Sequence, residues 1–153
     1  MKKNTFPNKK LEGGQSLVEL ALSLTIILLL LSGAVTFGMA YFSFLAINDA
    51  AQEGALYGSF NPQDVSGIKN RVQAASTSPV NLSQMPDSQI AVTYPNGLGK
   101  DCQGTVSGKA NTITVTVTYN YQVFMPFISA VIGSNTIPLT GSATDPVLVP
   151  LCP

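Results

Sequence analysis

Residues 13–31 read GGQSLVELALSLTIILLLL, and this stretch decides the fold because a long charge-free apolar run follows a single glutamate, Glu19. A carboxylate costs about 2.5–3.5 kcal/mol at the centre of a bilayer and less at its edge, where Glu19 would lie. A cut after Gly14 would give Gln15 a free α-ammonium, which can pair with the glutamate of a neighbouring copy in a helical bundle. We therefore predict cleavage between Gly14 and Gln15 and charge pairing at Glu19. The alternative is a plain membrane anchor with Glu19 among the headgroups.

The charge-free run extends from Leu20 to Asn48. As a helix it would be about 43 Å long, more than the roughly 30 Å hydrocarbon core of a bilayer, so we expect a membrane span at about 20–42. The apolar core of a removable signal peptide is only about 7–15 residues long, which indicates that this span is retained. Residues 1–14 form a basic leader, which orients the amino terminus into the cytoplasm and the rest of the chain to the outer side.

Charge and cysteine content narrow the classes of function. Four lysines and one glutamate give the leader a formal charge of +3, whereas four basic and seven acidic side chains give the remainder −3. Basic residues after the leader are too sparse for nucleic-acid binding. Cys102 and Cys152 are the only cysteines and histidine is absent, so we predict no metal site and no cofactor. On the oxidising outer side an even count favours a Cys102–Cys152 disulfide, and two free thiols are the alternative.

A face of small residues follows the span, with Ala46, Ala50, Gly54 and Gly58 at every fourth position. Small side chains at this spacing let helices approach closely, in membranes and in bundles alike. We therefore predict helix packing along this face. The sequence leaves open whether the face packs on another subunit or on the chain's own domain.

The remaining segment, 60–153, has the pattern of a small α+β domain. Asn61 as N-cap and Pro62 at the first helical position predict a second, short helix that ends near Ala75. Alternating apolar and threonine residues predict a strand over 112–124 with one buried face, and further strands are expected at 90–94 and within 136–149. Pro138 and Pro146 favour an edge position for the last segment. The predicted fold is thus α+β: a long N-terminal hydrophobic helix over 15–59, a short helix and an antiparallel sheet of about three strands.

The motifs at 14–22, 35–38 and 48–55, in this order, make the chain similar to the TadE-like minor pseudopilins of tight-adherence (Tad, or Flp) pili, a branch of the type IV pilin-like proteins. The resemblance covers residues 14 to about 59 and is loose beyond them. Relatives often carry an acid at the position of Thr36 and arginines near Met39, Gln52 and Leu56, so ionic contacts of those charges cannot be transferred.

The resemblance implies a minor pseudopilin that is processed after Gly14 by a prepilin peptidase and takes part in assembling or priming an adherence pilus. The implied partners are the peptidase, other pilin or pseudopilin subunits, an inner-membrane assembly platform and membrane lipid. The implied location is the cytoplasmic membrane, as a single-pass protein with its C-terminal domain outside, and an extracellular pilus after processing.

Two other classes of function remain open, and an enzyme is disfavoured. The chain has no Gly-x-Ser-x-Gly motif, no phosphate-binding loop and no paired carboxylates that suggest an acid–base site. A single-pass membrane-anchored outer domain is one alternative. A pseudopilin of a type II secretion or DNA-uptake system is the other, because it would share the same helix.

Overall fold

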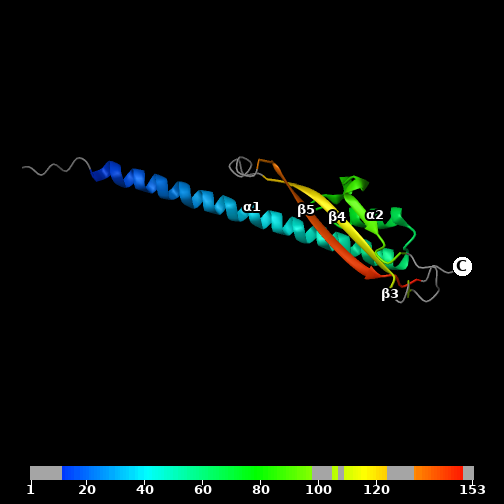
Figure 1. The fold of residues 1–153 in the computed structure, drawn as a ribbon. Helices are drawn as coiled ribbons and strands as arrows, with labels where there is room; N and C mark the ends of the chain where they lie inside the picture. Colours follow the sequence, from blue (N-terminus) through cyan, green and yellow to red (C-terminus); the bar gives the residue numbers. More distant parts are fainter. Residues whose placement is uncertain (1–11, 98–104, 107–108, 124–132, 150–153) are drawn as a thin grey trace, which may run out of the picture.

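The computed structural model describes residues 12–97, 105–106, 109–123 and 133–149. It confirms the predicted α+β class, with a long apolar helix, a short helix and a three-stranded antiparallel sheet (Figure 1). The leader residues before Glu12, Cys102, Cys152 and the apolar segment 127–132 lie outside the described residues. The elements in chain order are α1 (Glu12–Phe60), α2 (Val65–Ala74), the 3-10 turns η1 (Leu82–Gln84) and η2 (Asp87–Gln89), β1 (Ile90–Thr93), β2 (Thr105–Val106), β3 (Lys109–Ala110), β4 (Thr112–Gln122) and β5 (Thr136–Pro146).

Helix α1 has two halves with different surroundings. Between residues 14 and 42 no side chain is buried, and all but the last turns of this half extend away from the rest of the molecule (Figure 1). From Ser43 onward one face of the helix packs against the domain, where Ile47, Ala50 and Ala55 are fully buried. One continuous helix therefore serves both as an exposed apolar rod and as part of the core.

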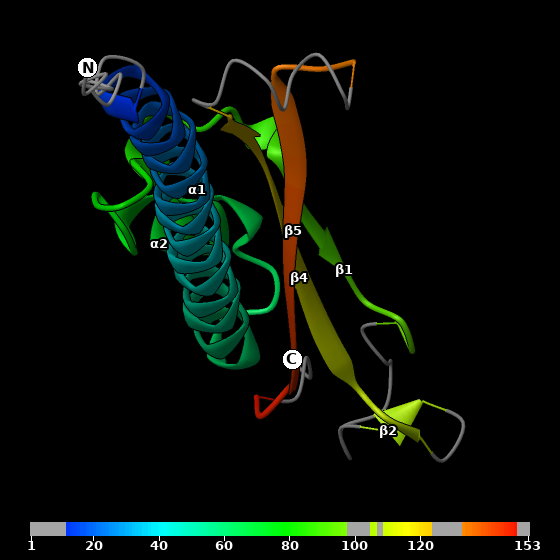
Figure 2. The ribbon, with the colours of Figure 1, turned by 90° about the vertical axis from the view of Figure 1, so that its left-hand side faces the viewer.

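The sheet has the order β1-β4-β5, and α1 lies along one of its faces (Figure 2). Ile113, Val115 and Val117 of β4 are fully buried, whereas the threonines between them are only partly covered. The period-two pattern thus sets one apolar face of the central strand against the helices. A separate two-stranded ribbon pairs β2 with β3.

Strand β5 runs unbroken from Thr136 to Pro146 beside β4 and forms an edge of the sheet, as its prolines predict. A Cβ atom built on Gly141 would come within 2.9 Å of the backbone of Ile47 and Asn48 in α1. Only glycine, which has no Cβ, allows this close approach of strand and helix. Gly141 therefore sets the distance between β5 and α1.

The predicted start of the second helix is wrong by three residues. Its N-cap is Asp64 instead of Asn61, because the Asp64 carboxylate accepts a hydrogen bond from the backbone N–H of Gly67 at 2.9 Å. Asn61 belongs to the turn after α1, since its N–H donates to the carbonyl of Tyr57 at 3.0 Å. Pro62 is buried in that turn, and its carbonyl accepts a hydrogen bond from the Tyr94 hydroxyl.

Candidate interaction surfaces

The predicted cleavage site lies in the first turns of α1 and is open to solvent. Gly14, Gln15 and Glu19 lie on an exposed part of the helix together with Val18 and Leu22. A Cβ at Gly14 would meet no atom within 4 Å, so packing of the described residues does not require glycine there. Two successive glycines, each about 1 kcal/mol worse than alanine in a helix, make this turn easy to unwind. A peptidase could therefore extend the backbone at little cost.

Glu19 projects from the exposed half of α1. The two ion pairs among the described residues are Lys69–Asp87 at 3.6 Å and Arg71–Glu53 at 4.0 Å, and neither includes Glu19. Gly14, Gln15 and Glu19 belong to the first turns of α1. That end of the helix lies away from the sheet and α2 (Figure 1).

The exposed half of α1 is long and apolar enough to cross a membrane, with a mean hydropathy of 2.4 in its most apolar window. Two of its threonine side chains are compatible with lipid because they bond to the helix itself. The hydroxyls of Thr25 and Thr36 donate to the carbonyls of Ala21 and Ser32, at 2.8 and 2.9 Å. Hydroxyls satisfied in this way do not need water inside a bilayer.

The small-residue face packs largely on the chain's own domain. A Cβ at Gly54 would lie 2.5 Å from Cγ2 of Val72, and one at Gly58 would lie 2.4 Å from Cδ1 of Ile113. Ala50 is fully buried in the same core. These three residues let α2 and β4 approach α1 closely. Ala46 is only partly buried and remains the member of the face that another molecule can contact.

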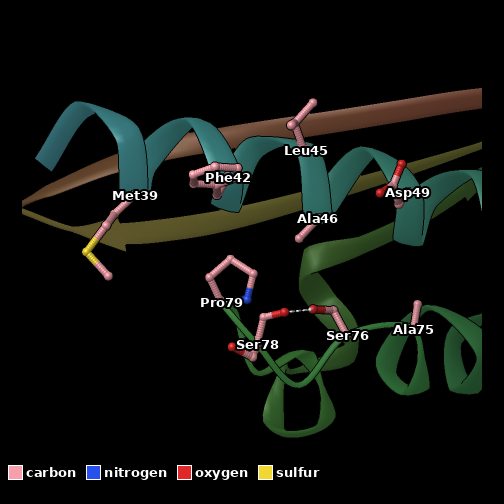
Figure 3. Close-up of a pocket in the computed structure, with 9 residues that line it drawn as sticks. All are labelled: Met39, Phe42, Leu45, Ala46, Asp49, Ala75, Ser76, Ser78 and Pro79. Carbon is pink, nitrogen blue, oxygen red and sulfur yellow. Dashed lines mark hydrogen bonds between the residues drawn. The ribbon is translucent and has the colours of Figure 1, made fainter. Parts of the chain in front are cut away.

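Ala46 lies in a groove of about 510 Å³ between α1 and the turn that follows α2 (Figure 3). In Figure 3 the side chains of Met39 and Ala46 point from the helix toward this turn, where Pro79 faces them. We call this the α1–turn groove. Its lining residues are Met39, Phe42, Leu45, Ala46, Asp49, Ala75, Ser76, Ser78 and Pro79.

Among the carboxylates of the described residues, Asp64 accepts the most hydrogen bonds, and its role is structural. The Gly67 N–H, the Ser66 hydroxyl at 2.7 Å and the Tyr57 hydroxyl at 2.9 Å all donate to it. These hydrogen bonds, that of Gly67 above all, hold the pKa of Asp64 below its usual value. They fix α2 to the end of α1. Burial raises the pKa of Tyr94, whose hydroxyl holds the same turn.

Among the described residues, no three His, Cys, Asp or Glu side chains are grouped so that they could hold a metal ion. The polar cluster around Asp64 instead caps α2 and joins it to the end of α1. The exposed surfaces of the described residues include the turn of the predicted cleavage site, the apolar half of α1 and the α1–turn groove.

A rod-like apolar helix that carries a small α+β domain at its C-terminal half defines a class of proteins with a single N-terminal membrane-type helix. The sequence of that helix was compared with known families. Residues 14–56 match the model of the family described as TadE-like protein, which confirms the resemblance over this segment. TadE-like proteins are structural pilus components. Comparisons with curated proteins and with solved structures give no match.

Sequence reasoning missed two features, the close contact of β5 with α1 and one wall of the α1–turn groove. Gly141 carried a detectable signal, because a glycine inside a strand often marks a close backbone approach. The wall of the groove at Ser78 and Pro79 carried none, because about thirty residues separate it from the helix face that it meets. Only the tertiary fold brings these segments together.

Proposed function

We propose that this protein is a minor pseudopilin that is processed by a prepilin peptidase and takes part in assembling or priming a Tad-type pilus used in adherence. The match of residues 14–56 to the TadE-like family is the single observation that carries the proposal. The same residues form the exposed part of α1 and the beginning of its packed part. The matched segment is thus mainly the part of the molecule that is free for interactions.

The proposed sequence of events uses three features of α1. The apolar half inserts into the cytoplasmic membrane, with the domain on the outer side. The peptidase then cuts after Gly14, where the helix is exposed and contains two adjacent glycines. The new ammonium of one subunit pairs with Glu19 of another as the apolar helices associate, and the pair is shielded from water by the surrounding side chains.

The partners follow from these steps. They are the peptidase, other pilin or pseudopilin subunits, the inner-membrane platform and the lipids around α1. The chain itself contributes no catalytic group in this proposal. The protein is a substrate of the peptidase and afterwards a structural subunit.

The deciding experiment is to co-express the full chain with its prepilin peptidase and determine the amino terminus by intact mass and sequencing. We expect a mature chain that begins at Gln15. Gly14→Leu should block the cut, because a bulky side chain prevents close approach of the backbone to a peptidase groove. Gly38→Leu is the matched control, since Gly38 lies on the same helix and a Cβ there also meets no atom within 4 Å.

A chain that still begins at Met1 in the presence of active peptidase would favour the uncleaved membrane anchor. Normal cutting of the Gly14→Leu chain would remove glycine from the recognition signal. Cutting after Gly14 without incorporation into a Tad pilus would instead favour a pseudopilin of a secretion or DNA-uptake system.

A further inference from the structure

Strand β5 is an edge of the sheet, and the hydrogen bonds at its two ends show which of its backbone groups point outward. The Val147 N–H donates to the carbonyl of Asn111 at 2.9 Å, and the register of β4 and β5 is unbroken from there to the other end. At that end the Val123 N–H donates to the carbonyl of Asn135 at 2.9 Å. Bonding alternates along an antiparallel pair, so the odd-numbered residues of β5 bond to β4. The even-numbered residues therefore point their N–H and C=O groups out of the sheet.

Both ends of this outer edge are closed to further pairing. Pro138 and Pro146 occupy outward positions and have no N–H to donate. The Ser134 hydroxyl donates to the carbonyl of Thr136 at 2.9 Å and accepts from its N–H at 3.1 Å, so the outward groups of Thr136 are already used.

The middle of the edge has no such protection. Among the described residues, no hydrogen bond uses the outward backbone groups of Thr140, Ser142 and Thr144, and all three residues are exposed. We call these three residues the β5 window. Edge strands that avoid pairing usually carry a charge or a proline, and the window has neither. It is therefore a template on which a further strand can form hydrogen bonds.

Strand β1 is the opposite edge of the sheet (Figure 2). The even-numbered residues of β4 bond toward β1, where their partners in register are Ala91 and Thr93. Alternation then leaves the backbone groups of Ile90, Val92 and the next residue, Tyr94, pointing outward.

Local hydrogen bonds already use two of the outward groups of this edge. The Ile90 N–H donates to the carbonyl of Asp87, and the Tyr94 carbonyl accepts from the Gly97 N–H at 2.9 Å. The groups that remain for pairing are the Ile90 carbonyl, both groups of Val92 and the Tyr94 N–H.

The direction of the strands decides which edges can meet. Both β1 and β5 run antiparallel to β4, so they run parallel to each other. Copies whose α1 helices lie in one membrane share one orientation, so β1 of one copy runs parallel to β5 of the next. Two β5 strands in an antiparallel ladder would instead require their α1 helices to point in opposite directions, because α1 extends along the sheet (Figure 1).

We propose that the β5 window binds β1 of a second copy of this chain as a parallel strand, so that the sheet continues from one copy into the next. This inference rests on the proposed membrane location, which gives the copies their shared orientation. With Val92 of the second copy opposite Gly141, the Thr140 and Ser142 N–H groups donate to the carbonyls of Ile90 and Val92. The Val92 and Tyr94 N–H groups donate in return to the carbonyls of Thr140 and Ser142. Each remaining group of β1 is then used once.

The side chains and the prolines agree with this pairing. Opposite residues of a parallel pair share a face, and Val92 and Gly141 both lie on the face that packs against the core. A shift of β1 by two residues, which places Val92 opposite Ala143, gives an equivalent set of bonds. A further shift in either direction sets Pro138 or Pro146 against a carbonyl of β1 that needs a donor. The prolines thus restrict the pairing to two registers.

The exposed face of the proposed pair allows a direct test by disulfide formation. Thr93 of the second copy lies opposite Ser142 in one register and opposite Thr144 in the other. Within one copy, Thr93 is separated from both by two strand spacings, about 9.5 Å, which is too far for a disulfide. A bridge between these positions therefore joins two copies.

Full-length chains with Thr93→Cys are co-expressed with differently tagged chains that carry Ser142→Cys or Thr144→Cys, and the membranes are oxidised. We expect bridges from position 93 to position 142 or 144, mapped by mass spectrometry to distinguish them from bonds of the native cysteines. Thr118→Cys is the matched control, because Thr118 lies on the same face of the central strand, one strand farther from the second copy. It should form no bridge with the Thr93→Cys chain.

The outcomes separate this inference from the proposed function. Chains in the membrane fraction without a bridge at 142 or 144 would overturn the inference and leave the membrane location standing. Bridges only between two Ser142→Cys chains would indicate an antiparallel β5 pair and also overturn it. Chains outside the membrane fraction would contradict the proposed function, and the shared orientation would fail with it.

A backbone variant tests the hydrogen bonds themselves. The variant is Thr140→Pro if position 142 forms the bridge and Ser142→Pro if position 144 forms it. Either proline removes one outward N–H and no bond to β4, and alanine at the same position keeps the N–H as the control. We expect the proline to reduce bridging about two- to tenfold relative to alanine, as for one hydrogen bond. Equal bridging by two variants with the same melting temperature would overturn the pairing.

Discussion

Gly54, Gly58 and Gly141 each lie at a close contact between α1 and the rest of the domain. Of the three replacements by alanine, Gly141→Ala should destabilise the domain most. The added Cβ would lie 2.9 Å from the Asn48 nitrogen, the Ile47 carbonyl carbon and the Ile47 Cγ2. Two of these three atoms are helix backbone, which cannot rotate away. The strand and the helix would have to separate by a few tenths of an ångström along their contact.

The expected cost follows from this geometry. Adding a methyl group to a filled core costs about 1–3 kcal/mol, and a gain of up to about 1 kcal/mol from the less flexible unfolded chain offsets part of it. For a domain of about 90 residues, 1 kcal/mol corresponds to roughly 4–8 °C in melting temperature. A mid-range cost of about 2 kcal/mol less this offset leaves about 1–2 kcal/mol, so we expect Gly141→Ala to lower the melting temperature by about 4–16 °C.

The assay is a thermal melt of the full chain in one detergent or nanodisc composition, followed by circular dichroism. Ser142→Ala is the matched control, because Ser142 is the next residue of β5 and is exposed on the other face. Gly54→Ala should have a smaller effect, since the methyl meets the Val72 side chain, and Gly58→Ala the smallest, since it meets the flexible end of Ile113. A Gly141→Ala chain as stable as the Ser142→Ala chain would refute this reasoning.

Three other predictions concern charge, cysteines and pH. Glu19→Gln keeps the size of the side chain but removes its charge, so membrane insertion and peptidase cleavage should persist. Incorporation into sheared pili should fall, because the ammonium of the neighbouring subunit loses its partner. Equal incorporation would assign Glu19 to the headgroups alone. Alkylation and mass mapping without reductant should find Cys102 and Cys152 bridged, and two labelled thiols would contradict this. Hydrogen bonds lower the pKa of Asp64 in the folded state. The contribution of its carboxylate to the stability of the domain is therefore complete above the ordinary carboxyl pKa and is lost as the pH falls through the lowered pKa. Melting temperature should therefore fall less steeply in acid for Asp64→Asn than for the unchanged chain, and parallel profiles would contradict the assigned hydrogen bonds.

The sequence predicted the elements of this fold well where one physical signal dominated. The charge-free run gave α1, and the alternation of Ile113, Val115 and Val117 with threonines gave β4 and its buried face. The prolines of β5 predicted an edge, because an edge strand has one side without ladder hydrogen bonds. Each of these signals is local, so no knowledge of the rest of the chain was needed.

Predictions failed or remained open where two signals competed or the partner was distant. Both Asn61 and Asp64 are good N-caps, and the choice between them depends on the Tyr57 hydroxyl, which reaches Asp64 from the end of α1. The small-residue face could have packed on another subunit or on the domain, and spacing alone does not distinguish these. Contacts of Gly54 and Gly58 with α2 and β4 show that most of it serves the domain. The cleavage, the pairing of Glu19 and the disulfide stay predictions.

The division of α1 at Ser43 has a mechanical consequence for the proposed transfer of this protein from a bilayer into a filament. The buried core takes side chains from Ser43 onward and none from residues 14–42. Exchanging lipid for neighbouring helices along the first half therefore changes no contact within the buried core. The hydroxyls of Thr25 and Thr36 stay bonded to their own helix in either environment. The domain can thus remain folded through the proposed transfer.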